Sequence, residues 1–212
     1  MDSNQIDQLR KSDASEKMLG LLTIIASTMD RFGGPISAFL SGVSIDRKED
    51  RVYEVIKRLC DDLNDLKSEA SEKYVNTEAF KELFEKTMIK AAGEQNREKR
   101  DLFRRFLLNS IKSATDDYDE QIRCLRIIEE MQIDHLKIIK VLIANTPADG
   151  KRNEGMQFPS LQHHLPGIGG EKVRDLVMHL NSLCVTEMTP TGVSAIVLTG
   201  FGRRFVKYII DD

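Results

Sequence analysis

Residues 165 to 199 have the sequence LPGIGGEKVRDLVMHLNSLCVTEMTPTGVSAIVLT, which predicts a turn, a helix and a β-hairpin in succession. Its opening LPGIGG combines proline and glycines and predicts a tight turn. Apolar residues then recur at three- and four-residue steps, which predicts an amphipathic helix over residues 171–183. The inward face of that helix consists of Val173, Leu176, Val177, Leu180 and Leu183.

A β-hairpin is predicted after this helix, because residues 184–188 and 195–199 favour strands and Pro190 and Gly192 mark a turn between them. Upstream, IDHLKIIKVLIA predicts a short helix over residues 133–144, followed by a solvated loop over 145–157 and a further segment at 159–164. Three helices followed by a two-stranded hairpin is the order of a winged helix, a relative of the helix-turn-helix. We therefore predict a winged-helix domain over residues 132–212 with a small β-hairpin near 184–199.

Residues 15–131 predict a mainly α-helical bundle, after a flexible polar leader at residues 1–14. Helices are expected over 15–29, from Asp46 or Asp50, from Thr77, over 94–112 and after 116–119. The buried stripes are expected at Val52, Val55, Ile56, Leu59, Leu63 and Leu66, and at Phe80, Leu83, Phe84, Thr87, Met88 and Ala91. Such a bundle also predicts a surface through which the chain forms a homo-oligomer.

Composition limits the class of protein. The chain is 41% hydrophobic and 31% charged, which suits a globular fold, and it has no tryptophan. Its three cysteines are far apart and form no CxxC pair, so Cys60 and Cys124 are predicted to be buried free thiols in a reducing compartment. The polar, acidic N-terminus does not resemble a signal peptide. We therefore expect a cytoplasmic protein.

Catalytic constellations are absent from the sequence. The stretch from Gly167 to Lys172 has neither the spacing of a P-loop nor the third glycine of a dinucleotide fingerprint. His163 and His164 are adjacent and have no acidic or cysteine partner at metal-binding spacing. The sequence thus predicts a protein that is not an enzyme, with no catalytic residue, metal or cofactor.

A nucleic acid or a protein is the predicted partner of the winged helix. Candidate nucleic-acid-binding residues are Lys172, Arg174, His179, Arg203, Arg204 and Lys207. Two observations weaken the nucleic-acid alternative. Residues 132–212 hold nine Lys and Arg against eight Asp and Glu, and the expected wing at 188–197 has no basic residue. The LPGIG stretch resembles the helix–hairpin–helix motif of DNA repair proteins, but a tight turn between two helices is the preferred interpretation.

Four arginines, Arg97, Arg100, Arg104 and Arg105, fall on one side of their predicted helix. Glu98 and Asp101 lie among them, so pairs at three- and four-residue spacing dilute the positive charge. We expect a solvated helix face there.

An alternative function rests on residues 18–43. Residues 18–29 and 32–43 are apolar and rich in small side chains, and Asp30 and Arg31 join them. They could act in a membrane-associated effector, but each is shorter than the roughly 20 residues that span a bilayer. A helix pair that closes the bundle core is the preferred interpretation, so membrane binding is not expected.

The central and C-terminal parts resemble a family of bacterial and phage-associated proteins, the abortive-infection alpha (Abi-alpha) family. The resemblance rests on Gly34-Pro35, Leu40–Gly42, Arg51–Leu66, Glu78–Phe80, Ala91–Glu94, Lys99-Arg100, Phe103, Phe106-Leu107, Asn109 and the closing LTGFGRRFVKYI at residues 198–209. It implies a helical bundle with a winged-helix end, whose last strand and tail helix lie at 198–209. It further implies a link to phage defence, and it transfers no catalytic residue.

Overall fold

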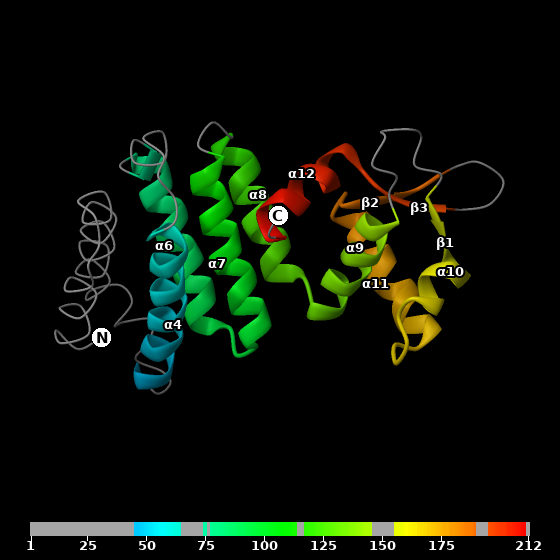
Figure 1. Ribbon diagram of the computed structural model, residues 1–212, viewed down its shortest axis with the longest axis horizontal. Helices are drawn as coiled ribbons and strands as arrows, with labels where there is room; N and C mark the ends of the chain where they lie inside the picture. Colours follow the sequence, from blue (N-terminus) through cyan, green and yellow to red (C-terminus); the bar gives the residue numbers. More distant parts are fainter. Residues whose placement is uncertain are drawn as a thin grey trace. The chain divides into compact units, whose positions relative to one another are not determined.

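The computed structural model describes residues 45–64, 74–75, 77–113, 117–145, 155–189 and 195–210. These residues are mainly helical, as predicted, and form eight α-helices and one small antiparallel sheet (Figure 1). The chain divides into two compact units, one ending at Glu129 and one running from Glu130 to Ile210. The domain bounds 15–131 and 132–212 stay a prediction, because compactness alone does not show that either unit folds independently.

The leader at residues 1–14 and the apolar segment at 18–43 both lie outside the described residues. Among the helices that are described, none combines the length and the apolar composition needed to cross a bilayer. The membrane alternative for residues 18–43 therefore stays a prediction.

The N-terminal unit is built from α4, α6, α7 and most of α8, with bounds Ile45–Asn64, Glu78–Gly93, Arg97–Lys112 and Tyr118–Glu130. Helix α4 packs on both α6 and α7, which also contact each other (Figure 1). The predicted stripes are confirmed where they are described: Val52, Val55, Ile56 and Leu59 are buried, and so is every predicted position of α6. The side chain of Leu63 and residue Leu66 lie outside the described part.

Phenylalanine supplies the largest side chains of this core. Phe80, Phe84, Phe103 and Phe106 are all fully buried. Phe80 and Phe84 are one turn apart, and their ring centroids lie 6.2 Å from each other. Aromatic rings bury more apolar area than aliphatic side chains, so these few phenylalanines compensate for the absence of tryptophan.

Side-chain caps set where two of these helices begin. The hydroxyl of Thr77 accepts a hydrogen bond from the Phe80 N–H, which confirms the predicted start of α6. Helix α7 was expected from residue 94, but it begins at Arg97. Glu94 is extended, and the Asn96 side chain accepts hydrogen bonds from the N–H groups of Glu98 and Lys99. Asparagine is among the best N-cap residues, which explains the later start.

The C-terminal unit contains four further helices and three strands in the order α9, β1, α10, α11, β2, β3, α12. Their bounds are Ile133–Ala144, Met156–Gln157, Phe158–His163, Gly170–Ser182, Thr186–Met188, Ala195–Leu198 and Gly200–Ile209. The predicted hairpin is confirmed: β2 pairs antiparallel with β3, with Glu187 opposite Val197. The predicted turn between α10 and α11 is also present, and Gly167 adopts a φ of 92° there.

Strand β1 was not expected, because residues 145–157 were predicted as a loop. Met156 and Gln157 pair antiparallel with Ile196 and Ala195, so β3 is the central strand of a sheet ordered β1-β3-β2. A strand of two residues is too short to show alternation in the sequence. Gly155 precedes it at a φ of 73°, and a Cβ there would lie 2.7 Å from the Val197 side chain, so only glycine suits this position.

Helix α11 ends in a tight turn that connects it to β2. The N–H of Val185 donates to the Leu180 carbonyl and the N–H of Cys184 donates to the Asn181 carbonyl, which is a Schellman arrangement. Cys184 therefore adopts a φ of 59°, in the left-handed region where glycine is usual. The side chain of Cys184 is exposed, whereas Cys124 is a buried free thiol as predicted.

The start of α12 is locked against this same turn. The Thr199 hydroxyl donates to the Cys184 carbonyl at 2.6 Å and accepts from the Gly202 N–H at 2.7 Å. The Thr199 N–H donates to the Val185 carbonyl at 3.1 Å. This approach leaves no room beside Gly202, where a Cβ would lie 2.0 Å from the Val185 carbonyl oxygen.

Substitution of Gly202 tests this close approach. Gly202→Ala forces the backbone of α12 away from Val185, and we expect the free energy of unfolding to fall by about 1–3 kcal/mol. Urea unfolding followed by circular dichroism, with hydrogen exchange of the β3 and α12 amides, measures the loss. Gly200→Ala is the matched control, because a Cβ there meets nothing within 4 Å. Equal stability of the two variants would contradict the packing described.

Candidate binding surface

The outer face of α11 carries two of the predicted site residues, Lys172 and Arg174, and both are exposed. Val173, Leu176, Val177 and Leu180 are buried as predicted, and Leu183 is only partly buried. The opposite face exposes Glu171, Lys172, Arg174, Asp175, Met178 and Ser182. Acidic, basic and apolar side chains therefore alternate along one surface.

Two basic residues of α11 are held by neighbouring elements. The Lys172 ammonium lies 2.5 Å from a carboxylate oxygen of Asp134 in α9. The Arg174 guanidinium lies over the ring of Phe158 in α10, at 5.4 Å from its centroid, which is a cation–π contact. Hydrogen bonds from Lys137 and Lys172 hold the pKa of Asp134 below its usual value, so this ion pair is charged at neutral pH.

His179 was predicted to be exposed, but it turns toward α9. Its Nδ1 lies 3.1 Å from the Nε2 of His135, which is 1% exposed. The His179 side chain is 38% exposed, and its Nε2 lies 4.0 Å from a carboxylate oxygen of Glu130. Residue spacing did not predict the contact between His135 and His179, because 44 residues separate the two histidines.

The remaining predicted residues lie on α12. Arg203 donates to the Leu198 carbonyl at 3.0 Å, and Arg204 lies 5.9 Å from the ring centroid of Phe201. Lys207 is exposed. Helix α12 packs mainly on β3, whereas α11 packs mainly on α9, α10 and β2. The six predicted residues thus belong to two helices with different packing partners.

Two methionines stand out on this unit. Met178 in α11 is 50% exposed and Met188 in β2 is 38% exposed, and they are the exposed large hydrophobic residues of the described chain. Helix α11 packs on β2. The helical spacing of α11 places Met178 on the outer face. Only the structure shows that two charged residues of this face, Lys172 and Arg174, contact α9 and α10.

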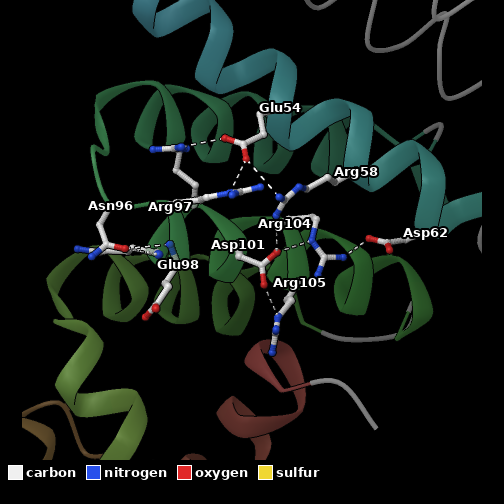
Figure 2. A network of polar contacts seen from close by, with 11 residues as sticks. Glu54, Arg58, Asp62, Asn96, Arg97, Glu98, Asp101, Arg104 and Arg105 are labelled. Atoms are coloured by element: carbon white, nitrogen blue, oxygen red, sulfur yellow. Dashed lines mark hydrogen bonds and ion pairs between the residues drawn. The ribbon is translucent and has the colours of Figure 1, made fainter.

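A second polar cluster lies between α4 and α7 in the N-terminal unit (Figure 2). Glu54 accepts from Arg97 at 2.9 Å and from Arg100 at 2.8 Å. Asp101 accepts from the Nε atoms of Arg104 and Arg105, both at 2.8 Å. Further contacts complete the arginine–carboxylate network, in which Arg58 pairs with Glu54 and Asp101, and Arg104 pairs with Asp62.

The expectation of a solvated arginine face is wrong for two of its members. The Arg100 and Arg104 side chains are only 12% and 11% exposed, because carboxylates of α4 cover them. The short-range pairs of Asp101 with Arg104 and Arg105 were expected, whereas the pairs across to α4 were not. The signal was present in Glu54, Arg58 and Asp62, which follow one another at four-residue steps on one face of α4.

Electrostatics in this network favour the charged state of its carboxylates. The hydrogen bond from Arg100 holds the pKa of Glu54 below its usual value, although burial acts in the opposite direction. Burial acts to raise the pKa of Asp101, but the hydrogen bonds and charges of Arg104 and Arg105 outweigh it and lower that pKa. The network is therefore a clamp between two helices, in which three carboxylates pair with five arginines.

Within the described ranges, no three His, Cys, Asp or Glu side chains gather closely enough to hold a metal ion together. No protein-family model, curated protein or solved structure matches the chain. The resemblance to the Abi-alpha family accordingly stays a prediction.

Removal of the Asp101 charge tests the clamp. We expect Asp101→Asn to lower the free energy of unfolding by about 1–3 kcal/mol at neutral pH, because it weakens charge-assisted hydrogen bonds to two arginines. A lowered carboxyl pKa stabilises the fold above the unfolded-state pKa and loses that effect as pH falls. The difference between wild type and variant should therefore shrink below about pH 4.

Urea unfolding over a range of pH measures this difference. Glu78→Gln is the matched control, since the glutamate of the Glu78–Lys81 pair is 83% exposed and such pairs contribute little. A loss of stability in Asp101→Asn that is no larger than in Glu78→Gln would show that the clamp does not stabilise the unit.

Proposed function

We propose that the chain is a non-enzymatic binding protein whose C-terminal unit is a winged helix that docks a protein partner through α11. The order α9, β1, α10, α11, β2, β3 and the sheet order β1-β3-β2 support this fold assignment. In helix-turn-helix proteins the second helix of the motif is the one presented to the ligand. Helix α11 occupies that position here.

The observation that carries the proposal is the half-exposed Met178 at the centre of a mixed face. Arg174 and Asp175 precede it by about one turn, and Ser182 follows it by one turn. Methionine and arginine are enriched in protein–protein interfaces, where an apolar centre is surrounded by polar groups. The contact with Phe158 restricts the Arg174 guanidinium in the free protein, which reduces the entropy lost on docking.

Charge favours a protein over a nucleic acid as the partner. Lys172 is already paired with Asp134, and Arg203 with a backbone carbonyl. Glu171 and Asp175 are exposed on the same face of α11 and would repel phosphates. In the described part of the hairpin, the only charged residue is Glu187, which is exposed. A nucleic-acid ligand would have to displace these internal contacts and overcome the exposed acids.

The resemblance to Abi-alpha proteins extends the proposal to a biological setting. Under it, the docked partner belongs to a phage-defence response.

Site-specific photo-crosslinking from position 178 of the full chain, in the host cell, tests the docking proposal. We expect a discrete protein adduct from position 178 and none from position 140, an exposed residue of α9. Arg174→Glu in the same chain should reduce the adduct at least about tenfold, as expected for a residue at the centre of an interface. Unfolding measurements should show a loss of stability of no more than about 1 kcal/mol, because Arg174 is exposed and loses only its cation–π contact with Phe158.

A salt titration of binding to DNA and RNA by the full chain decides the competing possibility. Phosphate contacts give a log–log slope of about −0.9 per neutralised phosphate. Salt-sensitive binding that Lys207→Glu abolishes, with no protein adduct from position 178, would replace the proposal by a nucleic-acid function.

A further inference from the structure

A chain of hydrogen bonds starts at the first turn of α9 and fixes the protonation of two histidines. The backbone N–H of Gln132 donates to the Nδ1 of His135 at 2.8 Å. Because a backbone amide nitrogen only donates, Nδ1 must carry a lone pair. A neutral imidazole has one proton, so His135 carries it on Nε2.

This tautomer sets the direction of the next bond. The Nε2–H of His135 points to the Nδ1 of His179 in α11, at 3.1 Å, and the two rings meet edge to face with their centroids 4.9 Å apart. Nδ1 of His179 is therefore the acceptor, and the proton of His179 lies on Nε2, on the side of Glu130. One backbone amide thus orders both rings.

Protonation of His179 is incompatible with the bond between the two rings. A proton added to His179 must go to Nδ1, where it faces the Nε2–H of His135 at 3.1 Å. His135 cannot yield by moving its own proton to Nδ1, because the Gln132 N–H already occupies that side. Two donors then face each other, and the link between α9 and α11 is lost.

Solvent and the Glu130 carboxylate can accommodate a protonated His179 ring. His179 is 38% exposed, so its ring can rotate toward solvent, and the Glu130 carboxylate at 4.0 Å attracts a positive charge. The other charged groups that bridge α9 and α11 are Asp134 and Lys172, with Lys137 beside them. These three are already paired in a contact that does not depend on histidine.

We propose that the His135–His179 pair is a pH-sensitive latch that holds α11 against α9 when both rings are neutral and releases it on acidification. Since α11 carries Met178, release weakens docking of the protein partner; this part of the inference rests on the proposed function. Histidine is the side chain whose charge ordinarily changes between about pH 5 and 8.

Amide hydrogen exchange of the full chain at about pH 7.5 and about pH 5.5, corrected for the intrinsic effect of pH, tests the latch. We expect protection of the α11 amides to fall about fivefold or more at the lower pH, the effect of losing one buried hydrogen bond. Imidazole ¹⁵N shifts should show the Nε2–H tautomer of His135 at the higher pH. A different tautomer, or protection of α11 that does not change with pH, overturns the proposal.

Three variants separate the latch from other effects of pH. In His179→Asn the amide oxygen can take the place of Nδ1 as an acceptor that does not titrate, so α11 should stay protected at both pH values. In His179→Leu the link is absent, and protection should be low at both. His163→Asn, at an exposed histidine of α10, should behave like wild type. A pH response in His179→Asn equal to that of wild type overturns the latch.

Crosslinking from position 178 at the two pH values tests the link to docking. We expect the adduct yield of wild type to fall about fivefold at the lower pH, in step with the exchange data, and that of His179→Asn to stay constant. An unchanged wild-type yield, in a protein whose α11 does respond, overturns regulation of docking and leaves the proposed function standing. If no adduct forms at either pH, the proposed function fails, while hydrogen exchange still decides the latch.

Discussion

The C-terminal unit depends on the pairing of β3 with a strand on each side. All four residues of β3 are buried, and the strand pairs with β1 along one edge and with β2 along the other. Strand β2 pairs with β3 over three residues, and β1 pairs with Ala195 and Ile196, so β3 has a strand partner on both edges. Helix α9 packs on β3 as well, and Thr199 carries the chain from the end of β3 directly into α12.

The placement of α11 follows from this sheet. Helix α11 packs on β2 and ends in the Schellman turn at Cys184, whose carbonyl accepts the Thr199 hydroxyl. The start of α12 and the end of α11 are therefore joined by hydrogen bonds from Thr199 to the carbonyls of Cys184 and Val185, and Gly202 permits this close approach because it has no side chain. The helix that presents Met178 is held at its C-terminal end by backbone geometry. On the side facing α9 it is held by the contact of His179 with His135 and by the ion pair of Lys172 with Asp134.

The two units use charge in different ways. In the N-terminal unit, arginines and carboxylates of α4 and α7 pair with each other where the two helices meet, and Arg100 and Arg104 are largely withdrawn from solvent. Such pairs give orientation to a helix interface whose apolar contacts alone are non-directional. In the C-terminal unit, the ion pair of Lys172 with Asp134 connects α11 to α9 but leaves both acidic and basic groups on the outer face. That mixture is the reason why we propose a protein partner for this surface.

Local patterns in the sequence predicted the bundle helices, the inward face of α11 and the hairpin. Periodicity at three- and four-residue steps is a local property, so the buried positions of α4, α6 and α11 followed from residue spacing alone. The sequence correctly predicted that α6 begins at Thr77. It did not predict Asn96 as the N-cap of α7, because several polar residues before α7 are possible caps.

Contacts between residues that are distant in the sequence depend on tertiary packing. Strand β1 exists because β3 offers it a partner, and two residues carry no periodic signal of their own. The pairs between α4 and α7, and the contact of His135 with His179 across 44 residues, depend on how helices pack. Spacing along the chain reports which face of a helix a side chain occupies, but not which helix lies opposite. For that physical reason, the sequence placed Met178 and His179 on one helix, whereas the contact of His179 with a buried histidine of α9 required the fold.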